Sequence, residues 1–122
     1  MAEKFEPQVV FERLKRILQK YEPAMQVQSD GQGNYYLNSP LRDKKGREVF
    51  FGAAAVKKNY VSYYLMPVYM FPELLEGISP GLKKRMQGKS CFNFKTVEDE
   101  ALQELEALTD QGFERFRDAQ LL

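Results

Sequence analysis

The 122-residue sequence contains no histidine, and its only cysteine is Cys91. Histidine is the commonest general base of enzymes and the commonest ligand of transition metals in proteins. Its absence excludes, within this chain, Ser-His-Asp and Cys-His mechanisms and zinc sites built from histidine and cysteine. A lone cysteine cannot form an internal disulfide, which is typical of proteins from a reducing compartment.

Long apolar runs and a strong net charge are also missing. No segment approaches the roughly 20 apolar residues needed to span a bilayer. The N-terminal residues 1–6 contain no apolar stretch resembling a signal peptide. The 18 basic and 17 acidic side chains leave a net charge of +1. We therefore expect a cytoplasmic protein with no membrane partner, and the charge balance disfavours nucleic acid as a partner.

The composition indicates one globular domain. Hydrophobic residues make up 43% of the chain and charged residues 29%, unlike the low-hydrophobicity, high-charge composition of disordered chains. A chain of 122 residues can bury one core but is too short for two full domains. We find no internal repeat or linker and expect residues 1–122 to form a single domain.

The hydrophobic pattern predicts a helix at each end of the chain. Apolar residues recur at three- and four-residue steps over residues 8–21, which places them on one helical face. A second apolar stripe, over residues 101–116, predicts a long terminal helix. Thr96 and Asp99 stand in a layout like a capping box at its start, and Gly112 is expected to bend or interrupt it.

Between these helices the sequence predicts an antiparallel sheet of about five strands, and thus an α+β fold. Residues 25–37 indicate a first hairpin, with turn residues at 30–33. Residues 47–56 indicate a buried central strand, whose small residues imply that something packs close to it. Residues 60–66 pair with that strand across the polar turn 57–59. Three further segments are a loop at 39–46, two short helical turns within 72–86 and a short strand at 90–94.

The stretch Gly46–Tyr64 resembles the central hairpin of the YdhG-like family of small bacterial domains of unknown function. Similar features follow it: a short helix at 82–86, a Gly-Lys strand at 88–94, and an aromatic helix end with arginines at 111–117. The chain departs from the family at Met25-Gln26-Val27, where members usually carry Gly-Met-Pro. The resemblance implies a sheet with the N-terminal and C-terminal helices packed on one face. For at least one branch of the family it also implies a frataxin-like role in handling intracellular iron.

Tyrosines are concentrated in the predicted sheet, with six of the seven between Tyr35 and Tyr69. In the adjacent pairs Tyr35-Tyr36 and Tyr63-Tyr64, the two side chains must point to opposite faces of a strand, so some tyrosines lie off the core. Cross-strand packing is the commoner use of such residues, and a binding surface is the alternative. The candidate contact residues on and beside the sheet are Tyr35, Tyr36, Tyr60, Tyr63, Tyr64, Lys57 and Lys58.

Acidic residues gather at the start of the terminal helix, at Glu98, Asp99, Glu100 and Glu104. Oxygen-rich clusters suit hard cations such as ferric or calcium ions, although weakly without histidine. The favoured interpretation is a solvated face whose acids complement the positive N-terminal end of the helix. The residues alone predict no cofactor, and iron enters only with the frataxin-like hypothesis.

Two basic spots lie near aromatic residues, a combination used to bind single-stranded nucleic acid. One is 83–85 with Lys89, and the other is 57–58 beside Tyr60. We favour the reading of both as solubility features because neither is large. The tripeptide 88–90, Gly-Lys-Ser, lacks the earlier glycine of a phosphate-binding loop, so we interpret it as a strand entrance.

These observations favour a non-catalytic binding or adaptor domain whose tyrosine-rich sheet surface contacts an unknown protein or small molecule. A frataxin-like iron-binding chaperone that uses surface carboxylates is the alternative, and an enzyme of unknown class is the third candidate. Any of the three is compatible with a homodimer. Cys91 is expected to be a half-buried structural residue, although Lys89 is near enough in sequence to lower the pKa of its thiol.

Overall fold

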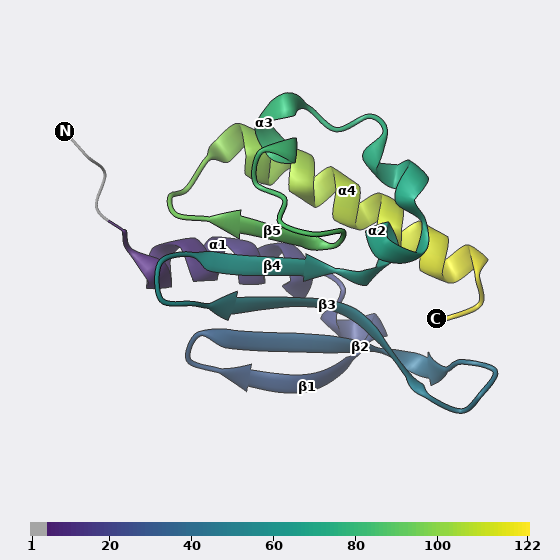
Figure 1. Ribbon diagram of the computed structural model, residues 1–122. Coiled ribbons are helices and arrows are strands. Elements are labelled where there is room, and N and C mark those ends of the chain that lie inside the picture. The colour runs from purple at the N-terminus through teal and green to yellow at the C-terminus, as the bar shows by residue number, and fades with distance from the viewer. Residues whose placement is uncertain (1–4) are drawn as a thin grey trace.

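A five-stranded antiparallel sheet forms one layer of the computed structural model, which describes residues 5–122 (Figure 1). Each strand pairs with the next one along the chain, in the order β1 (Gln26–Gly31), β2 (Asn34–Arg42), β3 (Glu48–Val56), β4 (Val61–Leu65) and β5 (Cys91–Phe94). Residues 1–4 lie outside the described residues, and they include most of the N-terminal segment 1–6 that showed no resemblance to a signal peptide.

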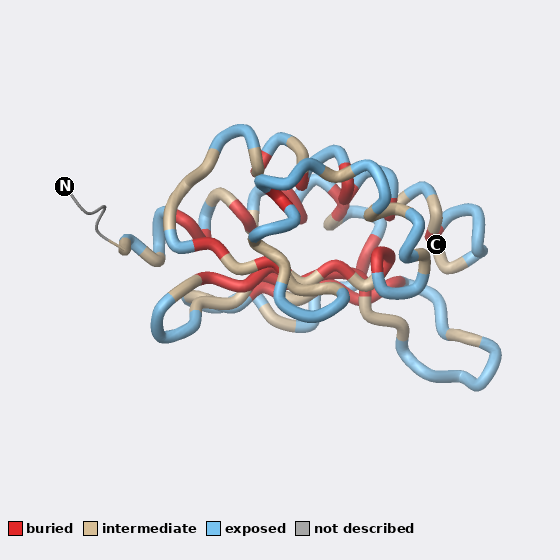
Figure 2. Tube along the Cα trace, turned by 45° about the horizontal axis from the view of Figure 1, so that its top comes forward, coloured by how far each residue is buried: buried red, intermediate tan, exposed pale blue. Residues whose placement is uncertain are grey.

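Two long helices, α1 (Pro7–Gln19) and α4 (Asp99–Asp118), form the second layer on one face of the sheet (Figures 1 and 2). The helix α1 contacts β3, β4 and α4. The shorter helical segments are η1 (Glu22–Ala24), α2 (Met66–Met70), η2 (Pro72–Leu75) and α3 (Pro80–Lys83). The predicted α+β fold is confirmed. Within residues 5–122, no helix is long and apolar enough to cross a membrane.

The core fills the space between the two layers and is rich in aromatic rings. Phe51 of β3 meets Tyr21, just after α1, at a ring-centroid distance of 5.9 Å, and Phe116 of α4 at 5.3 Å. Leu14 and Leu18, on the predicted apolar face of α1, have no exposed surface. The helical periodicity in the sequence therefore identified the buried face of α1 correctly.

Two glycines allow helices to approach their neighbours closely. A Cβ at Gly52 of β3 would lie 2.8 Å from Cδ2 of Leu18, so α1 is what packs against the small residues of the central strand, as predicted. A Cβ at Gly112 would lie 2.7 Å from Cβ of Pro67. The helix α4 runs uninterrupted through this position, so Gly112 accommodates α2 and does not break α4.

The β2–β3 connection differs from the expected loop. The strand β2 continues through the first half of that segment, to Arg42, and Arg42 pairs with Glu48, which makes an arm that projects from the sheet (Figure 1). The Asp43 carboxylate closes the tip by accepting hydrogen bonds from the backbone N–H groups of Lys45 and Arg47, each at 2.9 Å. The polar composition therefore predicted a loop where an aspartate-closed hairpin forms.

Two helix starts also differ from the sequence prediction. Residue 66, expected to end a strand, begins α2, because Pro67 occupies a first-turn position that proline tolerates well. At α4 the N-cap is Glu98, and no side chain caps the helix, so the predicted capping box is wrong. The Asp99 carboxylate instead accepts a hydrogen bond from Nη2 of Arg13 in α1 at 2.9 Å.

Candidate functional site

The sheet face opposite the helices is uncovered by any helix among residues 5–122 (Figure 2). One residue of each strand lies on this face in a continuous paired row, in the order Ser29, Tyr36, Ala53, Tyr64 and Cys91. Directly paired residues of an antiparallel sheet share a face. We call the surface formed by this row and Phe50 the outer face.

The adjacent tyrosine pairs divide between the two faces as the alternation predicted. Tyr35 and Tyr63 have no exposed surface and belong to the core, which removes them from the candidate contact surface. Tyr36 and Tyr64 are half-buried and lie on the outer face. The sequence defined the alternation, but only the position of the helices decides which member of each pair is exposed.

Phe50 is an outer-face residue that the sequence reasoning missed. A β-bulge shifts the register between β2 and β3, so that Leu37 pairs with Gly52 while Asn38 pairs with Phe50. The Phe50 ring therefore lies beside Tyr36, with ring centroids 4.6 Å apart, while Phe51 enters the core. The consecutive phenylalanines were the available signal, because neighbours in a strand point to opposite faces.

Cys91 ends the outer-face row and is half-buried, as expected. Burial raises the pKa of its thiol, and this effect outweighs the lowering caused by hydrogen bonds with Ser62 and Tyr64 and by the positive charge of Lys57. The sequence suggested that Lys89 would lower the pKa of this thiol. In the structure the lysine that does so is Lys57. A thiol with a raised pKa is a poor nucleophile near neutral pH.

The two basic spots of the sequence meet at one end of the sheet. A hollow of about 420 Å³ lies there, and the residues that line it are Asn59, Tyr60, Lys84, Arg85, Met86, Gln87, Asn93 and Lys95. We call this site the basic hollow. Tyr60 is half-buried at its wall, while Lys57 and Lys58 are exposed in the adjoining β3–β4 turn. Tyr60, proposed as part of the sheet surface, therefore belongs to a separate site.

Three of the four acidic residues of the metal hypothesis form contacts between helical segments. Glu98 accepts a hydrogen bond from Nη2 of Arg85 at 2.7 Å. Glu104 accepts one from the backbone N–H of Ser79 at 2.6 Å. Asp99 pairs with α1 as described above, and Glu100 is exposed. In the part of the chain that the structure describes, no three histidine, cysteine, aspartate or glutamate residues are grouped so that they could hold a metal ion.

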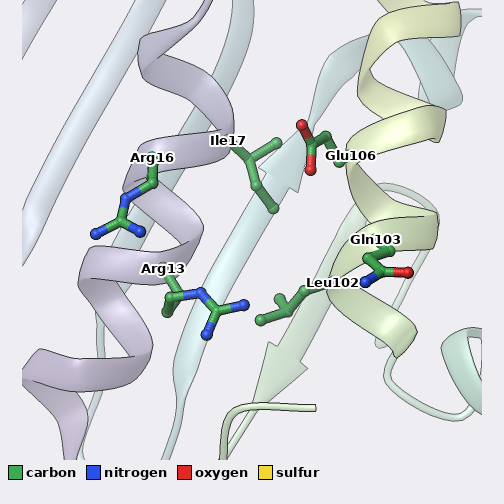
Figure 3. Close-up of a pocket in the computed structure, with 6 residues that line it drawn as sticks. All are labelled: Arg13, Arg16, Ile17, Leu102, Gln103 and Glu106. Atoms are coloured by element: carbon green, nitrogen blue, oxygen red, sulfur yellow. The ribbon is translucent and has the colours of Figure 1, made fainter. Parts of the chain in front are cut away.

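A second hollow, of about 200 Å³, lies between α1 and α4 (Figure 3). Arg13 extends toward α4, where it pairs with Asp99, whereas Arg16 points away from α4. Glu106 extends from α4 toward Ile17. Of the side chains that line this hollow, Arg13 is already paired across the helix interface and Arg16 points away from it. No group of potential catalytic side chains among residues 5–122 converges there.

The most strongly perturbed pKa values belong to buried tyrosines with structural partners. Burial raises the pKa of Tyr21, Tyr35 and Tyr63. The Tyr21 hydroxyl donates to Asp110 at 2.6 Å, and the Tyr35 hydroxyl donates to Glu22 at 2.5 Å. The first bond joins the end of α1 to α4 and the second joins η1 to the sheet, so the perturbation of these pKa values reflects packing and not a catalytic cleft.

Comparisons with protein-family models, with curated proteins and with solved structures found no match for this chain. The resemblance to the YdhG-like family therefore stays a prediction from sequence. The outer face gathers aromatic side chains, and the basic hollow gathers basic ones.

Proposed function

We propose that this protein is a non-catalytic binding domain whose outer face contacts a partner protein. The observation that carries the proposal is the asymmetry of the sheet, since both long helices cover one face. The other face bears the aromatic rings of Tyr36, Phe50 and Tyr64. An uncovered sheet face with half-exposed aromatic residues is a surface that gains free energy when a partner buries it.

The arrangement of this face favours a protein segment as the partner. Tyr36 and Tyr64 flank Ala53, and two strand spacings of roughly 4.8 Å separate them. Ala53 itself is almost completely buried, so the surface that a partner would contact here is formed by the two rings. Tyrosine provides apolar contact area together with a hydroxyl at its tip, a combination enriched in the centre of protein interfaces.

Positive charge at the border of the outer face favours a partner that carries negative charge. The positive charge of Lys57 acts on Cys91 at the end of the paired row, and Lys58 follows it in the exposed turn. A partner that carries a carboxylate beside its apolar side chains would complement this edge and associate faster at low ionic strength. The proposed partner is therefore an apolar protein segment flanked by acidic residues.

Site-specific photocrosslinking tests the proposal. A photoreactive phenylalanine analogue at position 64 is expected to crosslink a protein in cells of the source organism, whereas the same analogue at the exposed Tyr69 of α2 is the matched control. Crosslinking of equal strength from both positions would overturn the proposal. A product formed only with a second copy of this chain would also overturn it, because the occupant would then be a homodimer partner.

Binding measurements with the crosslinked protein, once purified, provide the quantitative test. The double variant Tyr36→Ser/Tyr64→Ser removes two central aromatic contacts and should weaken the affinity at least about 100-fold, as is typical of interface hot spots. Tyr69→Ser should leave the affinity unchanged. An unchanged affinity in the double variant would contradict the proposed contact surface.

A further inference from the structure

The basic hollow joins segments that are far apart in the sequence. Val61 at the start of β4 pairs with Phe94 at the end of β5, which brings Tyr60 and Lys95 to the same end of the sheet. The segment after α3 runs alongside β5, where the N–H of Asn93 donates to the carbonyl of Arg85 at 2.7 Å. These backbone contacts fix the positions from which the side chains reach the hollow.

The lining of the hollow carries positive charge and no carboxylate. Within residues 5–122, Lys84 and Lys95 form no ion pair. Nη2 of Arg85 donates to Glu98, whereas Nε of Arg85 is buried without a hydrogen-bond partner among the described residues. Two lysine charges therefore remain uncompensated, and the guanidinium is only partly satisfied.

Two of the three side-chain amides that line the hollow, those of Asn93 and Gln87, are oriented by a chain of hydrogen bonds that begins at Ser62. Oδ1 of Asn93 accepts a hydrogen bond from the Ser62 hydroxyl at 2.7 Å. Nδ2 of Asn93 donates to Oε1 of Gln87, also at 2.7 Å. Both amide oxygens are thus occupied within the protein, which leaves the NH₂ group of Gln87 available as a donor.

We propose that the basic hollow binds a phosphate-bearing ligand. A phosphate group is an acceptor of several hydrogen bonds and carries more than one negative charge, which matches two free ammonium groups, a guanidinium and an oriented amide donor. The volume of about 420 Å³ is within the range of small-molecule sites. The partly exposed Tyr60 ring lines the hollow and is available to stack on a nucleobase. The two ligand sources that fit this lining are an inorganic polyphosphate and a nucleoside polyphosphate.

Titration calorimetry at low ionic strength, with pyrophosphate and ATP as probes, tests this site. Saturable binding of one equivalent is expected. The variant Lys84→Gln/Lys95→Gln should weaken it at least about tenfold, because two charge-assisted contacts are lost. The control Lys44→Gln/Lys45→Gln removes the same charge from the exposed tip of the β2–β3 arm and should change the affinity less than about twofold.

The two probes distinguish the sources of the phosphate group. Equal affinity for pyrophosphate and ATP assigns the site to the phosphate alone, whereas tighter ATP binding that Tyr60→Leu abolishes assigns it to a nucleotide. Absence of binding, equal loss in the control variant, or equal binding of citrate would overturn the proposal. The Tyr36→Ser/Tyr64→Ser variant should bind phosphate normally, so failure of this site is separable from failure of the outer-face proposal.

Discussion

Tyr63 places its hydroxyl in the fully buried core, where Thr109 is its partner at 2.6 Å. The Thr109 hydroxyl donates to the carbonyl of Leu105 at 2.8 Å, so its oxygen accepts from Tyr63. We expect Thr109→Val, which keeps the side-chain shape, to reduce the free energy of unfolding by about 1–3 kcal/mol, because it leaves the buried Tyr63 hydroxyl unpaired. Urea unfolding measures this loss.

The double variant Tyr63→Phe/Thr109→Val is the control for this pair. Replacing both partners by apolar groups removes the unpaired hydroxyl, so the double variant should recover most of the lost stability. A double variant no more stable than Thr109→Val alone would show that the loss comes from packing and not from the unsatisfied group.

Asp110 couples the stability of the α1–α4 contact to pH. The Tyr21 hydroxyl and, less strongly, Lys20 lower the pKa of this carboxyl below its usual 3.8. A lowered folded-state pKa means that the stabilisation is complete above the unfolded-state pKa and is lost as the pH falls through the folded-state value. The unfolding free energy should therefore fall more steeply below about pH 4 in the native protein than in Asp110→Asn.

Urea unfolding between about pH 6 and pH 2 measures the difference between these two proteins. At pH 6 it should be under about 1 kcal/mol, since the Asp110 side chain is more than half exposed, and it should vanish in acid. Asp118→Asn, at the exposed end of α4, is the control for net charge. A constant difference across the range would contradict the linkage.

At the scale of elements, the crossing of α2 and α4 depends on Gly112. In an unconstrained helix Gly→Ala would stabilise by about 1 kcal/mol. Here the added Cβ would lie 2.7 Å from the ring of Pro67, which cannot rotate away. Because overpacking costs about 1–3 kcal/mol, we expect Gly112→Ala to lower the thermal midpoint despite its better helix propensity.

Gly77→Ala is the matched control for this crossing. A Cβ at Gly77 would have no atom within 4 Å, so this variant should change stability by no more than about 0.5 kcal/mol. If Gly112→Ala stabilised the protein instead, α2 would have to be free to move away from α4. Calorimetric unfolding of both variants decides between these outcomes.

The same crossing shows where prediction from sequence ends. The apolar stripe predicted α4, since helical periodicity is a local property, but it treated Gly112 as a weak point. The glycine is required by Pro67, which lies 45 positions earlier in the chain and reaches α4 only through the fold. The hairpin arm and Phe50 were missed for related reasons, because one depends on the Asp43 turn and the other on a one-residue bulge.

At the scale of the whole molecule, the candidate surfaces follow from how a one-sided α+β sandwich is built. Strand alternation predicted that some tyrosines must leave the core, and the structure assigns them because both long helices pack on the same face. The basic hollow could not be predicted in this way. Tyr60 and Lys95 lie at the same end of the sheet only because β4 and β5 pair in register, which is a long-range property that no local pattern encodes.

Tyr63 and Tyr64 provide a direct test of this two-sided organisation. They are neighbours in β4, but Tyr63 is completely buried beneath the helices while Tyr64 lies half-buried on the outer face. We expect Tyr63→Ala to cost about 3–5 kcal/mol, as for other large aromatic residues in cores. Tyr64→Ala should cost about 1 kcal/mol, since it loses mainly cross-strand contacts.

Urea unfolding of the two variants, with one method and one buffer, gives the comparison. A clear difference means that Tyr64 contributes little to folding and is available to a partner. Equal losses would mean that the outer face is as important to the folded state as the core. The half-exposed rings of Tyr36, Phe50 and Tyr64 would then be explained by folding stability alone, and the argument for a binding surface on that face would lose its foundation.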